Sequence, residues 1–285
     1  MSLVDAYLQQ RPERSKLSGR LGSKEDILLN IGCAVRAQGV LRPTNAGLLL
    51  FGFEPQQFLI QAEVVCVLYK PTTGKQQCYA DRRILHGPIT EQIDRAEAFF
   101  KQYIPIAARM EGFHRIDEPD YPLEALRGAV VNAVVHRDYS IKNEAVRIFY
   151  YPERIEVHNP GMLMPGLTLE DLQQGAARSK PRNPVVAMVL RDFPGGYMER
   201  VGSGIRFMID QMRELGRPDP QFREQNEFLV TFFREESPAG GENKKQTYRI
   251  SLPSSRGRLQ NLGQSNWPAR LLHTFSFGPS PMTHQ

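Results

Sequence analysis

The chain has 285 residues, of which 41% are apolar and 24% are charged, as in an ordinary globular protein. No run approaches the ~18 apolar residues of a membrane span, and the first residues lack a basic segment before an apolar stretch. We therefore expect neither a membrane helix nor a signal peptide. Three scattered cysteines, Cys33, Cys66 and Cys78, fit neither a disulfide framework nor a zinc site and favour a reduced, cytoplasmic setting.

The net charge of +5 is located in the last 49 residues of the chain. Residues 237–285 hold six basic residues and one acid, so residues 1–236 are net neutral. This tail is rich in Ser, Pro and Gly and has no sustained hydrophobic period, which predicts disorder. A basic tail could also bind DNA weakly through its phosphates, without sequence preference.

The first part of the chain predicts short elements. Ser23, followed by early acids, predicts the start of a helix, and residues 44–52 predict a second helix that Gly52 closes. The β-branched residues of 62–69 predict a strand. Apolar residues at helical spacing predict a longer helix over 88–110, which Pro105 should kink or end.

The later segments alternate between helix and strand patterns. In chain order we expect a helix over 121–136, two strands over 144–158 around a Pro152-Glu153 turn, an Asn159-Pro-Gly161 turn, about forty residues rich in Gly, Pro and basic residues, a helix from Gly202-Ser-Gly204 to Leu215, and a strand over 228–233.

The helix over 121–136 carries a polar face. Glu124, Gly128, Asn132 and His136 follow one another at steps of four and so share one side of the helix. This side could simply face solvent. The later Gly-x-Gly at a helix start offers free N–H groups and a positive dipole end to an anion. Two glycines alone are common at a helix start; the order of Asn-bearing helix, hairpin, Asn-x-Gly turn, flexible segment and Gly-x-Gly helix is what favours a ligand site.

Several strings carry a resemblance to a known family over residues 39 to 233. They are Pro43-Thr-Asn-Ala-Gly-Leu-Leu-Leu-Phe-Gly52, Leu126-Arg-Gly-Ala-Val-Val-Asn-Ala-Val-Val-His-Arg-Asp-Tyr139, Glu156-Val-His-Asn-Pro-Gly161, Arg182-Asn-Pro184 and Glu199-Arg-Val-Gly-Ser-Gly-Ile205. In these strings the chain resembles bacterial RecG-related proteins, described as ATP-dependent helicases or transcriptional regulators, whose C-terminal domain is similar to a GHKL (HATPase) ATPase. The Gly-x-x-x-x-Gly-Lys-Ser/Thr phosphate loop of a helicase motor is absent from the sequence.

The resemblance implies an α/β fold, an α+β two-layer sandwich of GHKL/Bergerat type with helices on one face of a mixed sheet. It implies three regions: a small α/β segment at 1–115 that holds part of a schlafen/AlbA-associated region and a connector, an ATP-binding domain at 116–236, and the disordered tail at 237–285. Relatives often carry a whole schlafen/AlbA-type domain before this region and a winged helix after it. Neither fits the residues before Gly39 or the tail, so we do not expect sequence-specific DNA binding.

The resemblance also implies a site for ATP and Mg²⁺. Asn132 would bind the Mg²⁺ that bridges the phosphates, since Mg²⁺ prefers hard oxygen ligands and keeps several waters. Asn159 would stand where GHKL proteins usually have the Asp that binds the adenine amino group, and Gly161 would let the backbone approach the base. The remaining residues implied at the nucleotide are His136, Gly202 and Gly204, with a lid over 162–198 that carries Arg178, Lys180 and Arg182.

One departure from the family concerns hydrolysis. GHKL ATPases have a general-base Glu four residues before the Asn, and this chain has Gly128 there. Glu124 lies one turn further back, about 6 Å along the helix axis, and Asp138 is a weak alternative. We therefore expect nucleotide binding with weak or no hydrolysis.

Four functions stay open from the sequence. The first is an ATP-binding regulatory protein, in which the nucleotide biases an interface with a protein partner or a homodimer. The second is a slow ATPase that uses Glu124 or Asp138, and the third is a nucleic-acid-binding regulator with a vestigial pocket. The fourth is a shortened relative that retains no activity.

Overall fold

The computed structural model describes residues 3–10, 23–71, 78–111, 113–193, 196–198 and 204–235. The predicted disorder of the tail and the predicted phosphate contact of Gly202 lie outside the described residues. Within these ranges, every helix is too short or too polar to cross a membrane.

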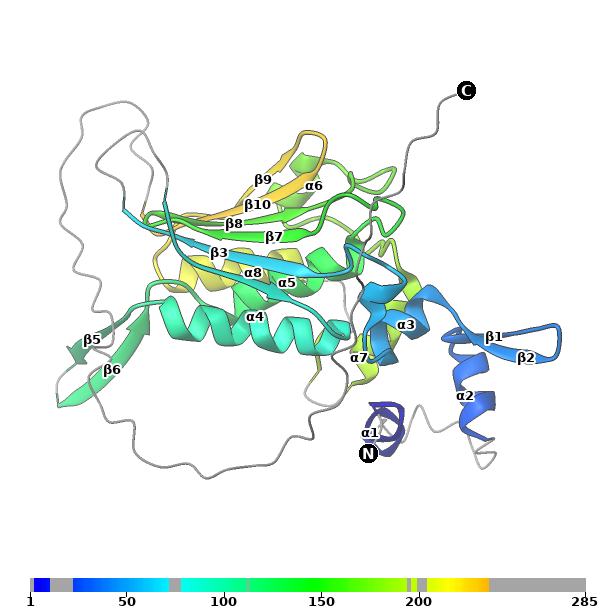
Figure 1. Cartoon of the computed structure of the whole chain (residues 1–285). Helices are drawn as coiled ribbons and strands as arrows, with labels where there is room; N and C mark the ends of the chain where they lie inside the picture. The colour runs from blue at the N-terminus through cyan, green and yellow to red at the C-terminus, as the bar shows by residue number, and fades with distance from the viewer. Residues whose placement is uncertain are drawn as a thin grey trace, which may run out of the picture. The chain divides into compact units, whose positions relative to one another are not determined.

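A six-stranded mixed sheet forms the centre of the fold (Figure 1). Its strands, in spatial order, are β4 (Tyr79–Leu85), β3 (Val64–Tyr69), β7 (Val146–Tyr150), β8 (Arg154–Asn159), β10 (Phe228–Phe233) and β9 (Gln221–Glu224). Strands β3 and β7 are parallel, and all other neighbours are antiparallel. The predicted strands over 62–69, 144–158 and 228–233 are confirmed.

Three helices, α4 (Ile89–Tyr103), α5 (Leu123–His136) and α8 (Gly204–Glu214), lie on one face of this sheet (Figure 1). Helix α5 is central, and eight of its side chains are buried against its neighbours. The expected α/β fold, a two-layer sandwich with helices on one face of a mixed sheet, is confirmed.

The alternation of β8 determines which of its side chains reach the helices. Successive residues of a strand point to opposite faces, and here Ile155, Val157 and Asn159 are buried while Arg154 and Glu156 are only half-buried. Asn159 is therefore the polar end of an otherwise apolar inward row. This register places its amide beneath the sheet, on the side of α5.

Smaller elements surround the sandwich. They are α1 (Leu3–Gln10), α2 (Lys24–Asn30), the hairpin β1 (Ala34–Ala37) and β2 (Val40–Pro43), α3 (Asn45–Phe51), the 3₁₀ turn η2 (Pro55–Gln57), the hairpin β5 (Ile106–Glu111) and β6 (His114–Pro119), α6 (Leu169–Gln173) and α7 (Pro184–Asp192). Helix α2 begins with a capping box between Ser23 and Asp26, and α3 begins at Thr44 and ends before Gly52, as the sequence predicts.

Two sequence predictions are wrong in extent. Helix α4 ends at Tyr103 rather than Met110, because Pro105 stops it and the next residues pair as β5 with β6. The forty residues expected to be a flexible lid contain α6 and α7, and Val186, Val189 and Leu190 of α7 are fully buried. The second half of that segment is therefore a core helix.

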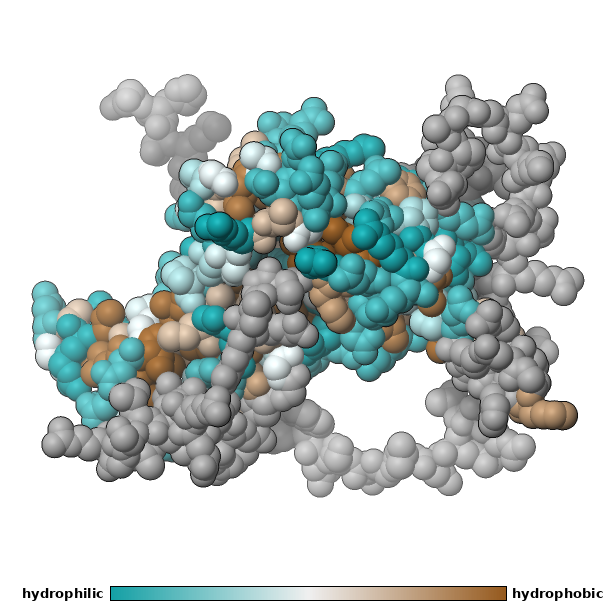
Figure 2. All heavy atoms as spheres, turned by 180° about the vertical axis from the view of Figure 1, so that it is seen from behind, coloured by the Kyte–Doolittle hydropathy of each residue, from teal (hydrophilic) through white to brown (hydrophobic). Residues whose placement is uncertain are grey.

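The surface is mainly hydrophilic on the side seen from behind, and hydrophobic atoms gather in smaller patches (Figure 2). The apolar core beneath it is continuous: it includes Tyr7 and Leu50 from the first hundred residues and Val130 and Phe232 from the rest. The division at residue 115 stays a prediction. In the structure, β3 before that point pairs with β7 after it.

Candidate functional site

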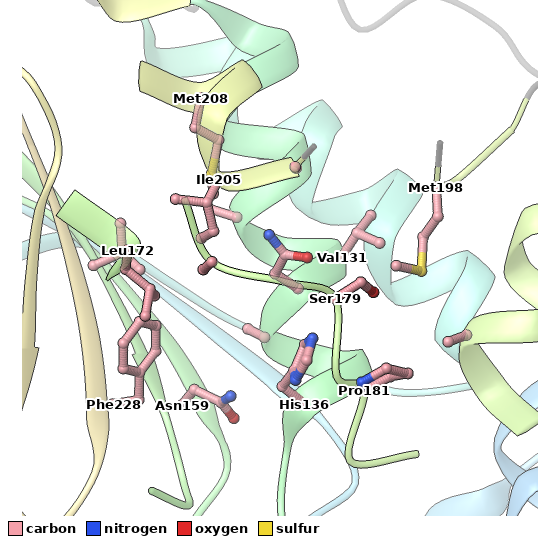
Figure 3. A pocket seen from close by; sticks show the side chains of 18 of the residues that line it. Val131, His136, Asn159, Leu172, Ser179, Pro181, Met198, Ile205, Met208 and Phe228 are labelled. Carbon is pink, nitrogen blue, oxygen red and sulfur yellow. The ribbon is translucent and has the colours of Figure 1, made fainter. Parts of the chain in front are cut away.

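A cavity of about 580 Å³ lies between the sheet and the helices α5, α7 and α8. This volume is within the range of roughly 300–1,000 Å³ that small-molecule sites occupy. In Figure 3, His136 and Asn159 point into the same cavity, with Leu172 and Phe228 on one side and Val131 and Met198 on the other. The residues on the polar face of α5, Glu124, Gly128, Asn132 and His136, all line this cavity, and Glu124 is also exposed to solvent.

Asn159 occupies a buried, mostly apolar part of the cavity. It is 4% exposed, and its Oδ1 has no hydrogen-bond partner. Its neighbours in the lining include Val157 on the same strand and Phe228, which is paired with it across β10. A buried oxygen without a partner costs about 1–3 kcal/mol, and a ligand that donates a hydrogen bond here would remove that cost.

Asn132 and Gly204 meet at the start of α8. A Cβ built on Gly204 would lie 3.4 Å from the Nδ2 of Asn132, so glycine lets the N-terminus of α8 come close to this amide. The N-terminus of a helix attracts anions through its free N–H groups and its dipole. The Asn132 oxygen fits one ligand position of a Mg²⁺ ion whose other ligands are phosphates and waters.

His136 lines the same cavity as these two amides. Burial, with the nearby Arg182 cation, lowers its pKa to about 4. The imidazole is therefore neutral at neutral pH, with one nitrogen that donates and one that accepts. It can bind a polar ligand group, but it does not add positive charge to the site.

The charges around the cavity are mostly positive. Its basic lining residues are Arg127, Arg178, Lys180, Arg182 and Arg191, and among the described residues that line it the one acid is Glu124. Such an excess of cations attracts a polyanion such as a triphosphate.

Side chains from outside α5 bind the carbonyl oxygens at its C-terminus, next to His136. Tyr139 Oη donates to Val134 O at 2.9 Å, and Arg182 Nε donates to His136 O at 3.1 Å. Asn183 Nδ2 donates to both Val135 O at 2.9 Å and Arg137 O at 2.8 Å. Four consecutive carbonyl groups that a helix end leaves open are thus satisfied.

The buried Arg137 extends this arrangement into the next loop. Its Nη2 donates to the carbonyl oxygens of Ile141 and Glu144, and its guanidinium lies over the Tyr139 ring, 4.6 Å from the centroid. In His136-Arg-Asp-Tyr139, Arg137 and Tyr139 therefore hold the chain in place, and His136 faces the cavity.

Two predicted site residues lie beside the cavity rather than in its lining. Gly161 has φ +121°, which favours glycine, and a Cβ there would come 3.0 Å from the Cβ of Asp138. The Asp138 carboxylate accepts hydrogen bonds from Ser140 N and Oγ, which lower its pKa, so it is a poor proton acceptor.

The structure has room for a side chain at position 128, where relatives have the general-base Glu. A Cβ on Gly128 would lie 3.7 Å from Met208 Cγ, an ordinary contact, so a side chain fits at its start. Glu124, one turn earlier, lines the cavity but is exposed. The cavity thus has space at position 128 and a carboxylate only at position 124.

The sequence reasoning missed one contact around the segment that precedes α8. Tyr197 Oη donates to the Asp94 carboxylate of α4 at 3.1 Å, and the Arg127 guanidinium lies 4.9 Å from the Tyr197 ring centroid. Tyr197 lines the cavity. No local sequence pattern could have paired residues about a hundred positions apart.

Comparison with known proteins agrees with this fold. Residues 143–232 match the HATPase-type family described as putative ATP-dependent DNA helicase recG C-terminal. No curated protein matches the chain. The crystal structure of the DIP2311 protein from Corynebacterium diphtheriae is similar, with a TM-score of 0.62 and 21% identity. That match covers 81% of this chain and 44% of the other, so the chain spans less than half of that protein's length.

At 21% identity the structural likeness concerns the fold alone, whereas the family match concerns the sequence. The matched range holds β7, β8 and β10, and with them Asn159. The resemblance read from the sequence is confirmed over residues 143–232, which match the HATPase-type family of the recG C-terminal region.

Proposed function

We propose that the chain binds ATP in this cavity and acts as an ATP-binding regulatory protein of the RecG-related family, with weak or no hydrolysis. The observation that carries the proposal is the buried, unpartnered oxygen of Asn159 in a cavity whose charged lining residues are mostly basic. Asn159 would accept a hydrogen bond from the adenine amino group. The triphosphate would lie toward Gly204 and the basic side chains.

Mg²⁺ would enter with the triphosphate. Asn132, beside the start of α8, would supply one oxygen, and the phosphates and waters would supply the other ligands. The described residues contain no group of three or more His, Cys, Asp or Glu side chains suited to a metal ion. A Mg²⁺ ion in this cavity would therefore depend on the nucleotide for its binding.

The basis for weak hydrolysis is the glycine at position 128. Water activation requires a base at about 3 Å from the water, and Gly128 has no side chain to provide it. A slow ATPase that uses the exposed Glu124, or Asp138, is the alternative function. It would require the attacking water to lie a full helix turn from the position that relatives use.

The wider role follows the family. We propose a transcriptional regulator or an accessory of DNA transactions in the cytoplasm, in which nucleotide binding biases an interface with a protein partner or a second copy. DNA contact would come from the basic residues 237–285, and deletion of this tail should abolish it. A nucleic-acid-binding regulator with a vestigial pocket would bind DNA but not ATP.

Isothermal titration calorimetry of the full chain with Mg-ATP tests the site. We expect binding in the natural chain and a loss of at least about tenfold in affinity in Asn132→Ala, since one metal ligand is removed. Asn45→Ala is the matched control, because Asn45 is exposed on α3 and does not line the cavity. Undiminished binding in Asn132→Ala would show that the site is assigned wrongly, and no binding in the natural chain would contradict the function.

A further inference from the structure

We infer that the cavity takes purine nucleoside triphosphates with either an amino or a carbonyl group at position 6 of the base, so that GTP binds as well as ATP. The inference rests on the proposed function, and it concerns the chemistry of the residue that meets the base.

The Asn159 amide has no partner that fixes its orientation. Its Oδ1 is buried without a hydrogen bond, and among the described residues no group bonds its Nδ2. Its backbone is held by the register of β8 with β10, where it pairs with Phe228. The strand therefore fixes where the amide lies, while no hydrogen bond to a described residue sets which way round the amide is turned.

An amide presents a donor and an acceptor side by side. The edge of adenine offers an amino donor beside a ring-nitrogen acceptor, and the edge of guanine offers a carbonyl acceptor beside a ring N–H donor. The same amide, turned half-way round, complements either edge. A carboxylate at this position only accepts, so it would repel a carbonyl oxygen at position 6.

The surroundings of Asn159 do not favour one base over the other. The nearby lining is apolar, with Val157, Leu172, Phe228 and Val230. Arg182, whose guanidinium approaches the Asn159-Pro-Gly161 turn, already donates to His136 O and to Met162 O. Among these neighbours the Asn159 amide is the group that would meet the base edge, and it can match both purines.

Calorimetry of the full chain with Mg²⁺ and four ligands tests this inference. We expect the Kd values of ATP and GTP to agree within about tenfold. ITP should follow GTP, because inosine keeps the carbonyl and the ring N–H. Tripolyphosphate should bind at least about tenfold more weakly than ATP, because Asn159 contributes only when a base is present. Equal binding of tripolyphosphate would overturn the inference, since the base would then not be read.

Two substitutions of Asn159 separate hydrogen bonding of its amide to the base from the packing of its side chain. Asn159→Asp, measured at about pH 8 where the carboxylate is ionised, should raise the ATP-to-GTP affinity ratio at least about tenfold. Asn159→Leu should weaken both nucleotides in proportion and leave the ratio unchanged. Because each ratio is taken within one variant, a uniform loss of folded protein cancels.

The outcomes are distinct. A preference for ATP over GTP of more than about tenfold in the natural chain, or an unchanged ratio in Asn159→Asp, would overturn the inference but leave ATP binding intact. Failure of every nucleotide to bind would overturn the proposed function itself.

Discussion

Arg182 donates a hydrogen bond from Nε to the carbonyl oxygen of His136, at 3.1 Å, and so joins the segment before α7 to the end of α5. The Nη2 of the same guanidinium donates to Met162 O at 2.6 Å, in the segment that follows β8. One side chain therefore connects three parts of the cavity wall that are distant in sequence.

Loss of this connection should reduce both stability and binding. We expect Arg182→Ala to lower the free energy of unfolding by about 1–3 kcal/mol, because carbonyl groups lose a charged donor. We also expect Mg-ATP affinity to fall about tenfold, because a cation beside the site is lost. Arg182→Lys should recover only part of both, since lysine lacks the planar fork.

The control for this series is Arg213→Ala. Arg213 is exposed and pairs with Asp219 at 2.6 Å, away from the cavity lining. It should change stability by less than about 0.5 kcal/mol. Urea unfolding and calorimetry measure the two effects. If Arg182→Ala behaved like Arg213→Ala, Arg182 would not hold the cavity wall.

Substitution at position 128 tests the missing base. Gly128→Ala should stabilise the chain by about 0.5–1 kcal/mol, because a glycine inside a helix is flexible when unfolded and the added Cβ meets only Met208 at 3.7 Å. Gly128→Glu should raise ATP turnover, measured by phosphate release, whereas the uncharged Gly128→Gln should not. Strong turnover in the natural chain that disappears in Glu124→Ala would instead favour the slow-ATPase function.

The lowered pKa of the half-buried His136 should make stability depend on pH. Its pKa is about 4 in the folded chain against 6.5 for a free histidine, so the unfolded chain takes up the proton first as the pH falls. The stability should therefore fall from about pH 7 to pH 4, by up to about 3 kcal/mol from this group.

Comparison with His136→Asn isolates this effect, since asparagine keeps a donor and an acceptor but does not titrate. His158 acts in the opposite sense: hydrogen bonds with Glu156 and Glu227 raise its pKa, so its contribution is lost as the pH rises through that value. The difference between the two chains cancels the His158 contribution. Equal pH slopes would contradict a His136 that stays neutral in the folded chain.

A chain of residues 116–236 tests the predicted domain boundary. We expect it to lack a cooperative unfolding transition, because it loses β3, the parallel neighbour of β7, and α4, which packs on α5. Circular dichroism during urea unfolding measures this. A cooperative transition would support a domain that begins near residue 116.

The parts of the fold that the sequence predicts are those with a strong local period. Helix α5 and the β7–β8 hairpin follow from apolar spacing, and the burial of Asn159 follows once β8 is a strand. Strand β4 was not predicted, because its outward residues are charged or exposed, as Arg82 is. Helix α7 lies in a stretch rich in Gly, Pro and basic residues, which indicates a loop. Pro184 stands at the first position of the helix, where proline is favourable, and so does not interrupt it.

The site shows the same division. Helical spacing places Asn132 and His136 on one side of α5, the resemblance implies that this side faces a ligand, and both residues line the cavity. The role of Asn183 could not, because its two acceptors lie 46 and 48 residues earlier in the chain. A side chain that completes a distant helix end has no local pattern.

The hydrogen bonds to the C-terminal carbonyl groups of α5 also affect how sequences of related proteins should be compared. Tyr139, Arg182 and Asn183 are required to fold this region whether or not a nucleotide binds. A chain that had lost its ligand would still be under selection to keep them. Asn132 and Asn159, whose side chains bond no other described residue, have no such structural duty. Substitution of Asn132 or Asn159 in a relative would therefore indicate loss of nucleotide binding, whereas the other residues of the shared sequence motifs can be kept for folding alone.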